Sequence, residues 1–318
     1  MLSFRGVECD HRFRKKTSTV LPKTSMITPV KRVLKIDDWF HPDGFPISIE
    51  RREPQEDFEP HAHEFAELVI VTGGKGLHVT VQDSWELAAG DVFVMAGPRE
   101  HEYRELRDLR LVNILYQPSQ LQMRLLDLPS VAGYHALFTL EPKRRQRQPA
   151  GGRLRLNGKE MAQITGLVDR LEGELKAREP GFGFMATAAF MQIIGLLSRY
   201  YGRSPSSDGR ALLRIGEALS HLERNIHCAV NLEELASIAQ MSRRSFLRVF
   251  QSATGTSPLA WQIDQRISRA CALLRHTDKR VTEIAFEMGF NDSNYFTRQF
   301  RKVTGFSPRD YRMRQGAG

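Results

Sequence analysis

The hydrophobic pattern of the C-terminal third predicts two pairs of short helices. In the first helix of each pair, apolar residues recur at spacings of three and four, which places them on one face. They are Leu232, Leu235, Ala236 and Ala239 in the first pair, and Val281, Ile284, Ala285 and Met288 in the second. Asn231 and Glu234 predict a capping box before the first helix of the first pair. Ser242 predicts the start of its partner, as Asn291 or Asp292 does in the second pair.

The two pairs form an internal repeat with a period of fifty residues. The repeat matches Phe246, Arg248, Phe250, Thr254, Gly255, Ser257 and Pro258 with Phe296, Arg298, Phe300, Thr304, Gly305, Ser307 and Pro308. Two short helices that cross steeply around a tight turn are the helix-turn-helix geometry that reads DNA. Pro258 and Pro308 each suit the first position of a further helix. The pattern therefore predicts two helix-turn-helix units.

Between the units, residues 258–275 predict an amphipathic helix. Its inner face is expected to consist of Leu259, Ile263, Ile267, Ala270 and Leu274. A helix of roughly 18 residues spans about 27 Å. A rigid connector of this order can set two recognition helices into successive major grooves, which are about 34 Å apart.

Side chains that the core does not need are the candidates for reading DNA. We expect the inward set of the two recognition helices to be Phe246, Val249, Phe250, Tyr295, Phe296 and Phe300. The outward set is then Arg243, Arg244, Leu247 and Arg248 in the first helix, and Ser293, Asn294, Thr297 and Arg298 in the second. Arginine can bridge two acceptors on guanine, and asparagine can pair in the same way with adenine. Contacts to phosphate place the protein on the DNA without reading its base sequence. They are expected from Arg214, Arg266, Arg280, Arg301 and Lys302.

Residues 36–140 show a different pattern, in which short apolar runs are separated by Gly, Pro and Asp. The runs include residues 68–72, 77–81, 92–96 and 109–116. Tight turns are expected at Gly73-Gly74 and at Ala89-Gly90-Asp91. Many short strands at even spacing predict a small β-barrel.

The predicted barrel contains a cluster of candidate ligand-binding side chains. His61, His63 and Glu67 lie at even spacings along a strand and therefore point to the same side, and His101 follows later. Such a set suits Zn²⁺, Fe²⁺ or Mn²⁺, and it equally suits hydrogen bonds to a small polar ligand. Further candidates for stacking on a sugar or hydrogen-bonding to it are His78, Trp85 and Tyr103. Each of these three can also be an ordinary core residue.

Two helices are predicted between the barrel and the DNA-binding units. Residues 157–179 carry a stripe that consists of Ile164, Leu167, Leu171 and Leu175. The stripe and the apolar helix after Gly181 fit a dimerising helix pair, and the alternative is packing onto the barrel. Residues 181–198 hold no charge but include three Gly, so we expect a buried or interface helix rather than a membrane span. Residues 202–209 predict the interdomain linker.

Charge separates the ends of the chain from its middle. The net charge of +9 divides into +7 for residues 1–35, −5 for 36–209 and +7 for 210–318. A basic domain joined to an acidic one suits a polyanion binder that carries a separate sensor. The three cysteines are far apart and lack metal-type spacing, which favours a reducing, cytoplasmic compartment. The basic residues 1–35 are expected to form a disordered extension.

The second helix-turn-helix unit carries a distinctive string of residues. It contains Ile284-Ala285, Gly289-Phe290, Asp292-Ser293-Asn294-Tyr295-Phe296, Arg298, Phe300-Arg301, Gly305-Phe306-Ser307-Pro308 and Tyr311-Arg312. These residues resemble the DNA-binding domain of the AraC/XylS family of bacterial transcription regulators, over residues 210–313. The resemblance implies base-reading roles for Arg244, Leu247, Arg248, Ser293, Asn294, Thr297 and Arg298. Leu247 departs from the polar residue that is more usual in the family.

The predicted barrel carries a second resemblance. The segments concerned are Leu34-Lys35, Asp37-Asp38, Phe40, Phe65, 67–71, 76–79, Gly90-Asp91, His101, Tyr103, Asp108-Leu109, Asn113-Ile114 and Tyr116. They resemble the AraC-family activators of L-rhamnose catabolism, and the His and Glu positions resemble the cupin pattern. The resemblance implies a small sugar as inducer, with L-rhamnose first. Sugar-sensing members of the family carry similar His and Glu in a metal-free barrel, so we expect no metal and no other cofactor.

These observations predict a DNA-binding activator that is not an enzyme. The fold class is α+β with two domains: a cupin-like β-barrel with dimerisation helices (36–201), and an all-α domain with two helix-turn-helix units (210–313). The expected partners are promoter DNA, RNA polymerase, a sugar effector and a second copy of the chain, with no membrane. Effector binding would favour the arrangement that fits paired half-sites. The alternatives are a metal-dependent cupin enzyme fused to a DNA-binding domain, and a constitutive architectural DNA binder.

Overall fold

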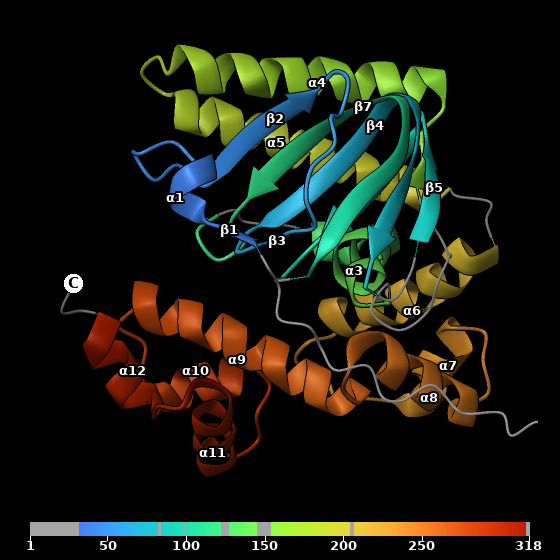
Figure 1. Ribbon diagram of the computed structural model, residues 1–318. Coiled ribbons are helices and arrows are strands. Elements are labelled where there is room, and N and C mark those ends of the chain that lie inside the picture. Colours follow the sequence, from blue (N-terminus) through green and yellow to red (C-terminus); the bar gives the residue numbers. More distant parts are fainter. Residues whose placement is uncertain are drawn as a thin grey trace, which may run out of the picture.

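The computed structural model describes residues 32–81, 84–97, 99–121, 127–144, 154–203 and 207–315 (Figure 1). A sheet with helices on one face is followed by a helical C-terminal part. The expected two-domain α+β class is confirmed. The predicted disordered extension, up to residue 31, lies outside the described residues.

The sensing half is built on a mainly antiparallel sheet. Its strands are β1 (Val33–Leu34), β2 (Ile47–Arg52), β3 (Ala62–His63), β4 (Ala66–Thr80), β5 (Ser84–Ala88), β6 (Asp91–Met95), β7 (His101–Tyr116) and β8 (Leu154–Arg155). The larger sheet has the order β2-β7-β4-β6-β8, with β5 also paired to β4, while β1 pairs with β3 in parallel. Within the described residues this pairing does not close into the complete barrel that the sequence predicts.

The expected turn at Gly73-Gly74 is wrong, because β4 continues through both glycines. Its pairing with β7 changes register between Val71 and Leu77, which marks bulges rather than a chain reversal. Gly74 has a φ of +67°, and a Cβ atom there would lie 1.9 Å from the carbonyl oxygen of Asp108. Glycine is therefore required for the bulge. The other expected turn, which contains Gly90, is confirmed and connects β5 to β6.

Alternation along the strands separates two faces of the sheet. On β4, Leu68 and Ile70 join the core beneath the helices, whereas Val69 and Val71 belong to a second, inner cluster. Successive side chains of a strand point to opposite faces. Glu67 has the same parity as Val69, so it lies on the inner face.

Two long helices cover the outer face of the sheet (Figure 1). They are α4 (Gly158–Ala177) and α5 (Phe182–Tyr201), which pack against each other. The predicted stripe on α4 is used inside the chain, because Ile164, Leu167 and Leu171 are buried in the main core. Of the two predicted uses of the stripe, the structure shows packing within the chain. Any dimer interface must therefore use residues other than these three.

Within the described part of the chain, α5 is the one helix long and apolar enough to cross a membrane by length and composition. It buries nine residues, among them Phe190, Ile193 and Leu197, against the rest of the protein. Its most exposed apolar residues, Phe184 and Met185, lie near its start. The packing matches the buried or interface helix that the sequence predicts.

The C-terminal part consists of short helices around one long connector. They are α6 (Ser207–Arg224), α7 (Leu232–Ile238), α8 (Arg243–Thr254), α9 (Pro258–His276), α10 (Val281–Glu287), α11 (Ser293–Thr304) and α12 (Pro308–Gln315). The pairs α7–α8 and α10–α11 are the two predicted helix-turn-helix units, and they lie towards opposite ends of α9 (Figure 1). The expected caps form at Asn231, Ser242 and Asp292, whose side chains accept backbone N–H groups.

Two details of this part differ from the sequence prediction. Glu234 does not complete a capping box with Asn231, because its carboxylate lies 3.3 Å from His221 Nε2 on α6. Leu259, expected on the inner face of α9, is 54% exposed, and the interior beside it is filled by Trp261 and Gln262. Packing against α8, together with hydrogen bonds from Gln262 to the carbonyls of Asn225 and Cys228, therefore sets the inner face of this first turn.

Contact between the two halves is made by α6, which begins at Ser207, inside the expected linker. It packs on a 3₁₀ turn (Leu128–Ser130), on α2 (Ala132–Tyr134) and on a π-helical turn (His135–Leu140), which leads into α3 (Glu141–Arg144). Residues of the sheet, of these turns and of α8 belong to one continuous buried cluster. The first helix-turn-helix unit is therefore packed directly onto the sensing domain.

Candidate effector pocket and DNA-binding surface

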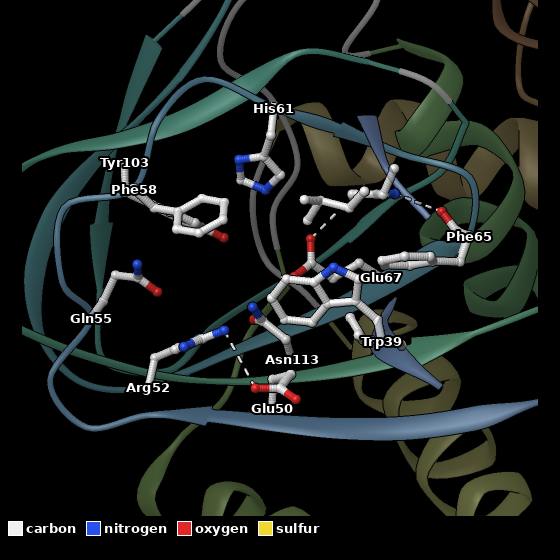
Figure 2. Close-up of a pocket in the computed structure, with 13 residues that line it drawn as sticks. Trp39, Glu50, Arg52, Gln55, Phe58, His61, Phe65, Glu67, Tyr103 and Asn113 are labelled. Carbon is white, nitrogen blue, oxygen red and sulfur yellow. Dashed lines mark hydrogen bonds and ion pairs between the residues drawn. The ribbon is translucent and has the colours of Figure 1, made fainter. Parts of the chain in front are cut away.

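A small cavity lies at the inner face of the sheet (Figure 2). Its volume is about 40 Å³, which is enough for roughly three water molecules. It is lined by Leu34, Trp39, Glu50, Arg52, Gln55, Phe58, His61, His63, Phe65, Glu67, Tyr103, Asn113 and Leu115. Apolar and aromatic walls with a few convergent polar groups are typical of small-molecule sites.

The structure brings most of the predicted ligand-binding residues together. His61, His63, Glu67 and Tyr103 line the cavity. His101 lies directly behind them, with its ring centre 4.4 Å from that of His61. His78 and Trp85 stack on each other with ring centres 4.1 Å apart, and both are buried away from the cavity. Neither residue lines the cavity, but His78 packs against His101 and Tyr103, with ring centres 5.3 and 5.2 Å apart.

The cluster is assembled from three strands rather than from one. The chain bends between His63 at the end of β3 and the start of β4, yet His63 Nε2 lies 3.4 Å from Glu67 Oε2. His101 Nε2 lies 3.7 Å from the same oxygen. His61 and His101 exchange backbone hydrogen bonds of 3.0 and 2.8 Å, which hold β7 beside the segment that leads into β3.

Burial and mutual proximity set the charges of the cluster. Burial alone would raise the pKa of Glu67, but the neighbouring histidines outweigh it and hold the pKa below its ordinary value. Burial lowers the pKa of His101 to about 4 and also lowers that of His61. Burial opposes protonation of His63 as well, but Glu67 raises its pKa above the ordinary value. Glu67 is therefore ionised and His101 neutral near pH 7.

Sequence reasoning missed the opposite wall of the cavity. Trp39 comes from α1 (Ile36–Trp39), and Arg52 and Glu50 come from β2, with Arg52 Nη2 3.3 Å from Glu50 Oε2. Asn113 on β7 is the cross-strand partner of Glu50. The one signal in the sequence was Asn113 itself, an isolated polar residue in the apolar run 109–116. Nothing local marked α1 or β2, which the fold brings to the cavity from outside that run.

Exposed polar side chains lie on both recognition helices. Arg244 and Arg248 are exposed on α8, and Asn294 and Arg298 are exposed on α11. These four residues are free to face a groove of DNA, where arginine and asparagine can make paired contacts with bases.

The other predicted base-reading residues are less accessible. Leu247 is half-buried and packs against the core. Ser293 and Thr297 are half-buried, and the Thr297 hydroxyl donates a 2.9 Å hydrogen bond to the Ser293 carbonyl. Arg243 is exposed but pairs with Glu233 at 2.7 Å. Tyr295, expected inward, is 37% exposed beside Arg298, so its inward placement is wrong.

The expectation that Arg266 contacts phosphate is also wrong. Its side chain is 8% exposed and donates to the carbonyls of Ile226, Cys228 and Gly289 over 2.6, 2.8 and 2.8 Å. The first two carbonyls precede the first helix-turn-helix unit, and the third lies in the turn of the second. Arg266 therefore clamps the two units together. Sequence reasoning assumed an outward arginine because charged residues are rarely buried.

This arrangement defines a class of protein, a regulator in which a sensing domain with an internal cavity carries two helix-turn-helix units. Residues 47–194 match the family model described as the AraC-like ligand binding domain. Residues 235–314 match a helix-turn-helix domain model. The chain belongs to the AraC family of transcription regulators.

Curated relatives cover nearly the whole chain. The HTH-type transcriptional activator RhaR of Yersinia pestis bv. Antiqua (strain Angola) is 31% identical over 287 residues, covering 89% of this chain and 94% of the relative. RhaR of Enterobacter sp. (strain 638) is 30% identical, covering 90% and 98%. The solved DNA-binding domain of AdpA, in complex with a target DNA, is 38% identical, covers 33% of this chain and 94% of that one, and has a TM-score of 0.31. The chain is accordingly a transcription regulator and not an enzyme.

Proposed function

We propose that this protein is a cytoplasmic activator that binds promoter DNA as a homodimer in response to a small sugar, with L-rhamnose the first candidate. The observation that carries the proposal is the presence, in one chain, of an internal polar and aromatic cavity and two exposed recognition helices. The choice of L-rhamnose rests on the resemblance of the sensing domain to activators of L-rhamnose catabolism.

The cavity offers the chemistry that a sugar requires. Trp39 and Phe58 provide aromatic surface for the C–H groups of a sugar ring, and Arg52 and Glu50 can hydrogen-bond to hydroxyl groups. Asn113 Oδ1 is buried without a hydrogen-bond partner among the described residues, and a hydroxyl donor would satisfy it. A monosaccharide needs more room than about 40 Å³. Binding a sugar therefore requires the cavity to widen.

Thermal unfolding with a panel of sugars tests the effector. We expect L-rhamnose to raise the unfolding temperature, and L-arabinose, L-fucose and D-xylose to have little effect. A ligand at about 100 times its Kd stabilises the folded state by about 2.7 kcal/mol, which corresponds to roughly 5–10 °C for a domain of this size.

A matched pair of variants locates the effect in the cavity. Arg52→Gln alters the cavity wall and should abolish the shift, whereas Arg104→Gln removes a similar arginine–glutamate pair at an exposed position and should leave it unchanged. If no sugar changes either the unfolding temperature or the affinity for DNA, the sensing role fails and a constitutive architectural binder replaces it.

The proposed regulation passes through the contact between the two halves. The π-helical turn His135–Leu140 packs against both α6 and α8, so a change in the sensing domain reaches the first recognition helix directly. Sugar binding would shift the population towards the arrangement that fits paired half-sites. The bound dimer would then recruit RNA polymerase.

Base reading by α11 is testable with one substitution. Arg298→Ala should weaken binding to a DNA site selected from random sequence by about 1–3 kcal/mol, or between about 5-fold and 150-fold in Kd, and should relax specificity at one position. Fluorescence anisotropy on the selected site and on random DNA measures both. Lys302→Ala provides the comparison, because loss of a phosphate contact weakens all sequences alike. Equal weakening by Arg298→Ala on both DNAs would exclude base reading by this residue.

A further inference from the structure

Three buried side chains converge at the back of the cavity. His63, Glu67 and His101 each offer a ligand atom, and these atoms lie within 4.8 Å of one another. The residues are 1%, 5% and 1% exposed. Within the described part of the chain, none of His63 Nε2, Glu67 Oε2 and His101 Nε2 makes a regular hydrogen bond, although His63 and Glu67 form an ion pair at 3.4 Å. Buried polar atoms are normally satisfied, so this convergence needs an explanation.

The hydrogen bonds of Nδ1 in His63 and His101 indicate the protonation of each ring, and hence whether Nε2 can donate to Glu67. His63 Nδ1 lies 2.6 Å from the Phe65 carbonyl oxygen, and His101 Nδ1 lies 3.2 Å from that of Arg99. A carbonyl can only accept, so each Nδ1 carries a proton, and whenever a ring is neutral the lone pair of its Nε2 faces Glu67. A proton shared between His63 and Glu67 would still leave the His101 lone pair unmatched. A cation at the centre would satisfy all three acceptors.

The donor set selects a class of cation. Two imidazole nitrogens and one carboxylate suit divalent first-row transition metals, whereas Mg²⁺ and Ca²⁺ prefer oxygen ligands. Backbone carbonyls that fix the protonated Nδ1 are the outer partners commonly found around metal-binding histidines. His63 and Glu67 also line the cavity, so the remaining coordination positions face the space assigned to the effector.

We propose that His63, Glu67 and His101 bind a divalent first-row transition metal ion, and that two hydroxyl oxygens of the effector complete its coordination. The second part rests on the proposed sensing function, whereas the metal site itself does not. This reading departs from the metal-free barrel that the family resemblance implies. The converging lone pairs, which only the tertiary structure places, are the reason for the departure.

Metal binding by the full-length protein tests the site. Protein stripped with a chelator is titrated with Co²⁺ or Zn²⁺, and bound metal per chain, unfolding temperature and the visible absorption of Co²⁺ are measured. We expect one ion per chain, a higher unfolding temperature and ligand-field bands. Glu67→Gln and His101→Gln should each lower the affinity by at least about 10-fold. His135→Gln removes a buried histidine outside the cluster and should bind metal as the unaltered protein does.

The outcomes separate the metal site from the sensing function. No bound metal, or equal binding by the Glu67 and His101 variants, overturns the site and leaves a metal-free ion pair in its place. If L-rhamnose raises the unfolding temperature equally in stripped and Zn²⁺-loaded protein, the sugar assignment stands and its coordination to the metal is overturned. If metal binds but no sugar has an effect, the site stands and the proposed effector fails. If L-rhamnose raises the unfolding temperature of Zn²⁺-loaded protein but not of stripped protein, both the metal site and the coordination of the sugar to it are supported.

Discussion

Replacing Arg266 with alanine should destabilise the DNA-binding half by about 3 kcal/mol or more. The substitution removes the donor to the buried carbonyl of Ile226 and to the part-buried carbonyl of Gly289, while the Cys228 carbonyl keeps its 3.0 Å bond from Gln262. Each such loss costs about 1–3 kcal/mol. Affinity for DNA should fall as well, because the two helix-turn-helix units are no longer held in one relative orientation. Urea unfolding and DNA titration over a range of salt concentrations measure the two effects.

The salt dependence of binding separates this clamp from a phosphate contact. Arg266→Ala should leave the slope of log Kd against log salt unchanged, while Arg301→Ala, at an exposed position, should reduce it by about 0.9 with little change in stability. The stability of Arg266→Lys should lie between that of the unaltered protein and that of Arg266→Ala, since a single ammonium group cannot reproduce the planar fork of donors. A reduced slope with unaltered stability in Arg266→Ala would contradict the clamp.

Adding a methyl group at Gly133 or Gly216 should disrupt the packing of α2 against α5 and α6, where the sensing domain meets the DNA-binding domain. A Cβ atom at this position would lie 1.9 Å from the carbonyl oxygen of Ser198 on α5, and one at Gly216 on α6 would lie 2.4 Å from that of Ala132. Both clashes are with backbone, so no side-chain rotation relieves them. We expect Gly133→Ala and Gly216→Ala each to cost about 1–3 kcal/mol, as overpacked cores do. Effector binding should then no longer change affinity for DNA.

Gly195 on α5 provides the control, because a Cβ atom there meets nothing within 4 Å. Gly195→Ala should be neutral or stabilise the helix by up to about 1 kcal/mol and should keep the response to effector. Thermal unfolding and DNA binding with and without sugar make the comparison. If Gly133→Ala retains both full stability and the sugar response, α2 does not transmit the signal.

Much of the DNA-binding domain could be predicted from the sequence because its signals are local. Helical spacing, the cap at Asn231 and the repeated Ser-Pro pairs act within a few residues of one another, and the structure places all of them as expected. The failures concern side chains whose environment comes from elsewhere in the chain. Arg266 is buried by the segment 226–228, and Leu259 is exposed because its neighbours fill the interior.

Prediction of the cavity from sequence was less complete. His61, His63, Glu67, His101 and Tyr103 do lie together, but not through the spacing on one strand that suggested the first three, because the chain bends between β3 and β4. Arg52 and Asn113 reach the cavity through the pairing of β2 with β7, and Trp39 on α1 joins them by packing over Arg52. The predicted turn at Gly73-Gly74 was wrong because a glycine pair is typical of both a turn and a bulge. Pairing with the partner strand decides between them.

Two helix-turn-helix units behind a strand-rich sensing domain are predictable from local signals, because hydrophobic periodicity, caps and the internal repeat are short-range properties. Which polar side chains are buried, and what they face, depends on the tertiary fold. It turned Arg266 inward as a clamp, set Gly133 against α5, and placed Nε2 of both His63 and His101 beside the Glu67 carboxylate. Such placements depend on contacts between distant segments, for which one sequence carries no local signal.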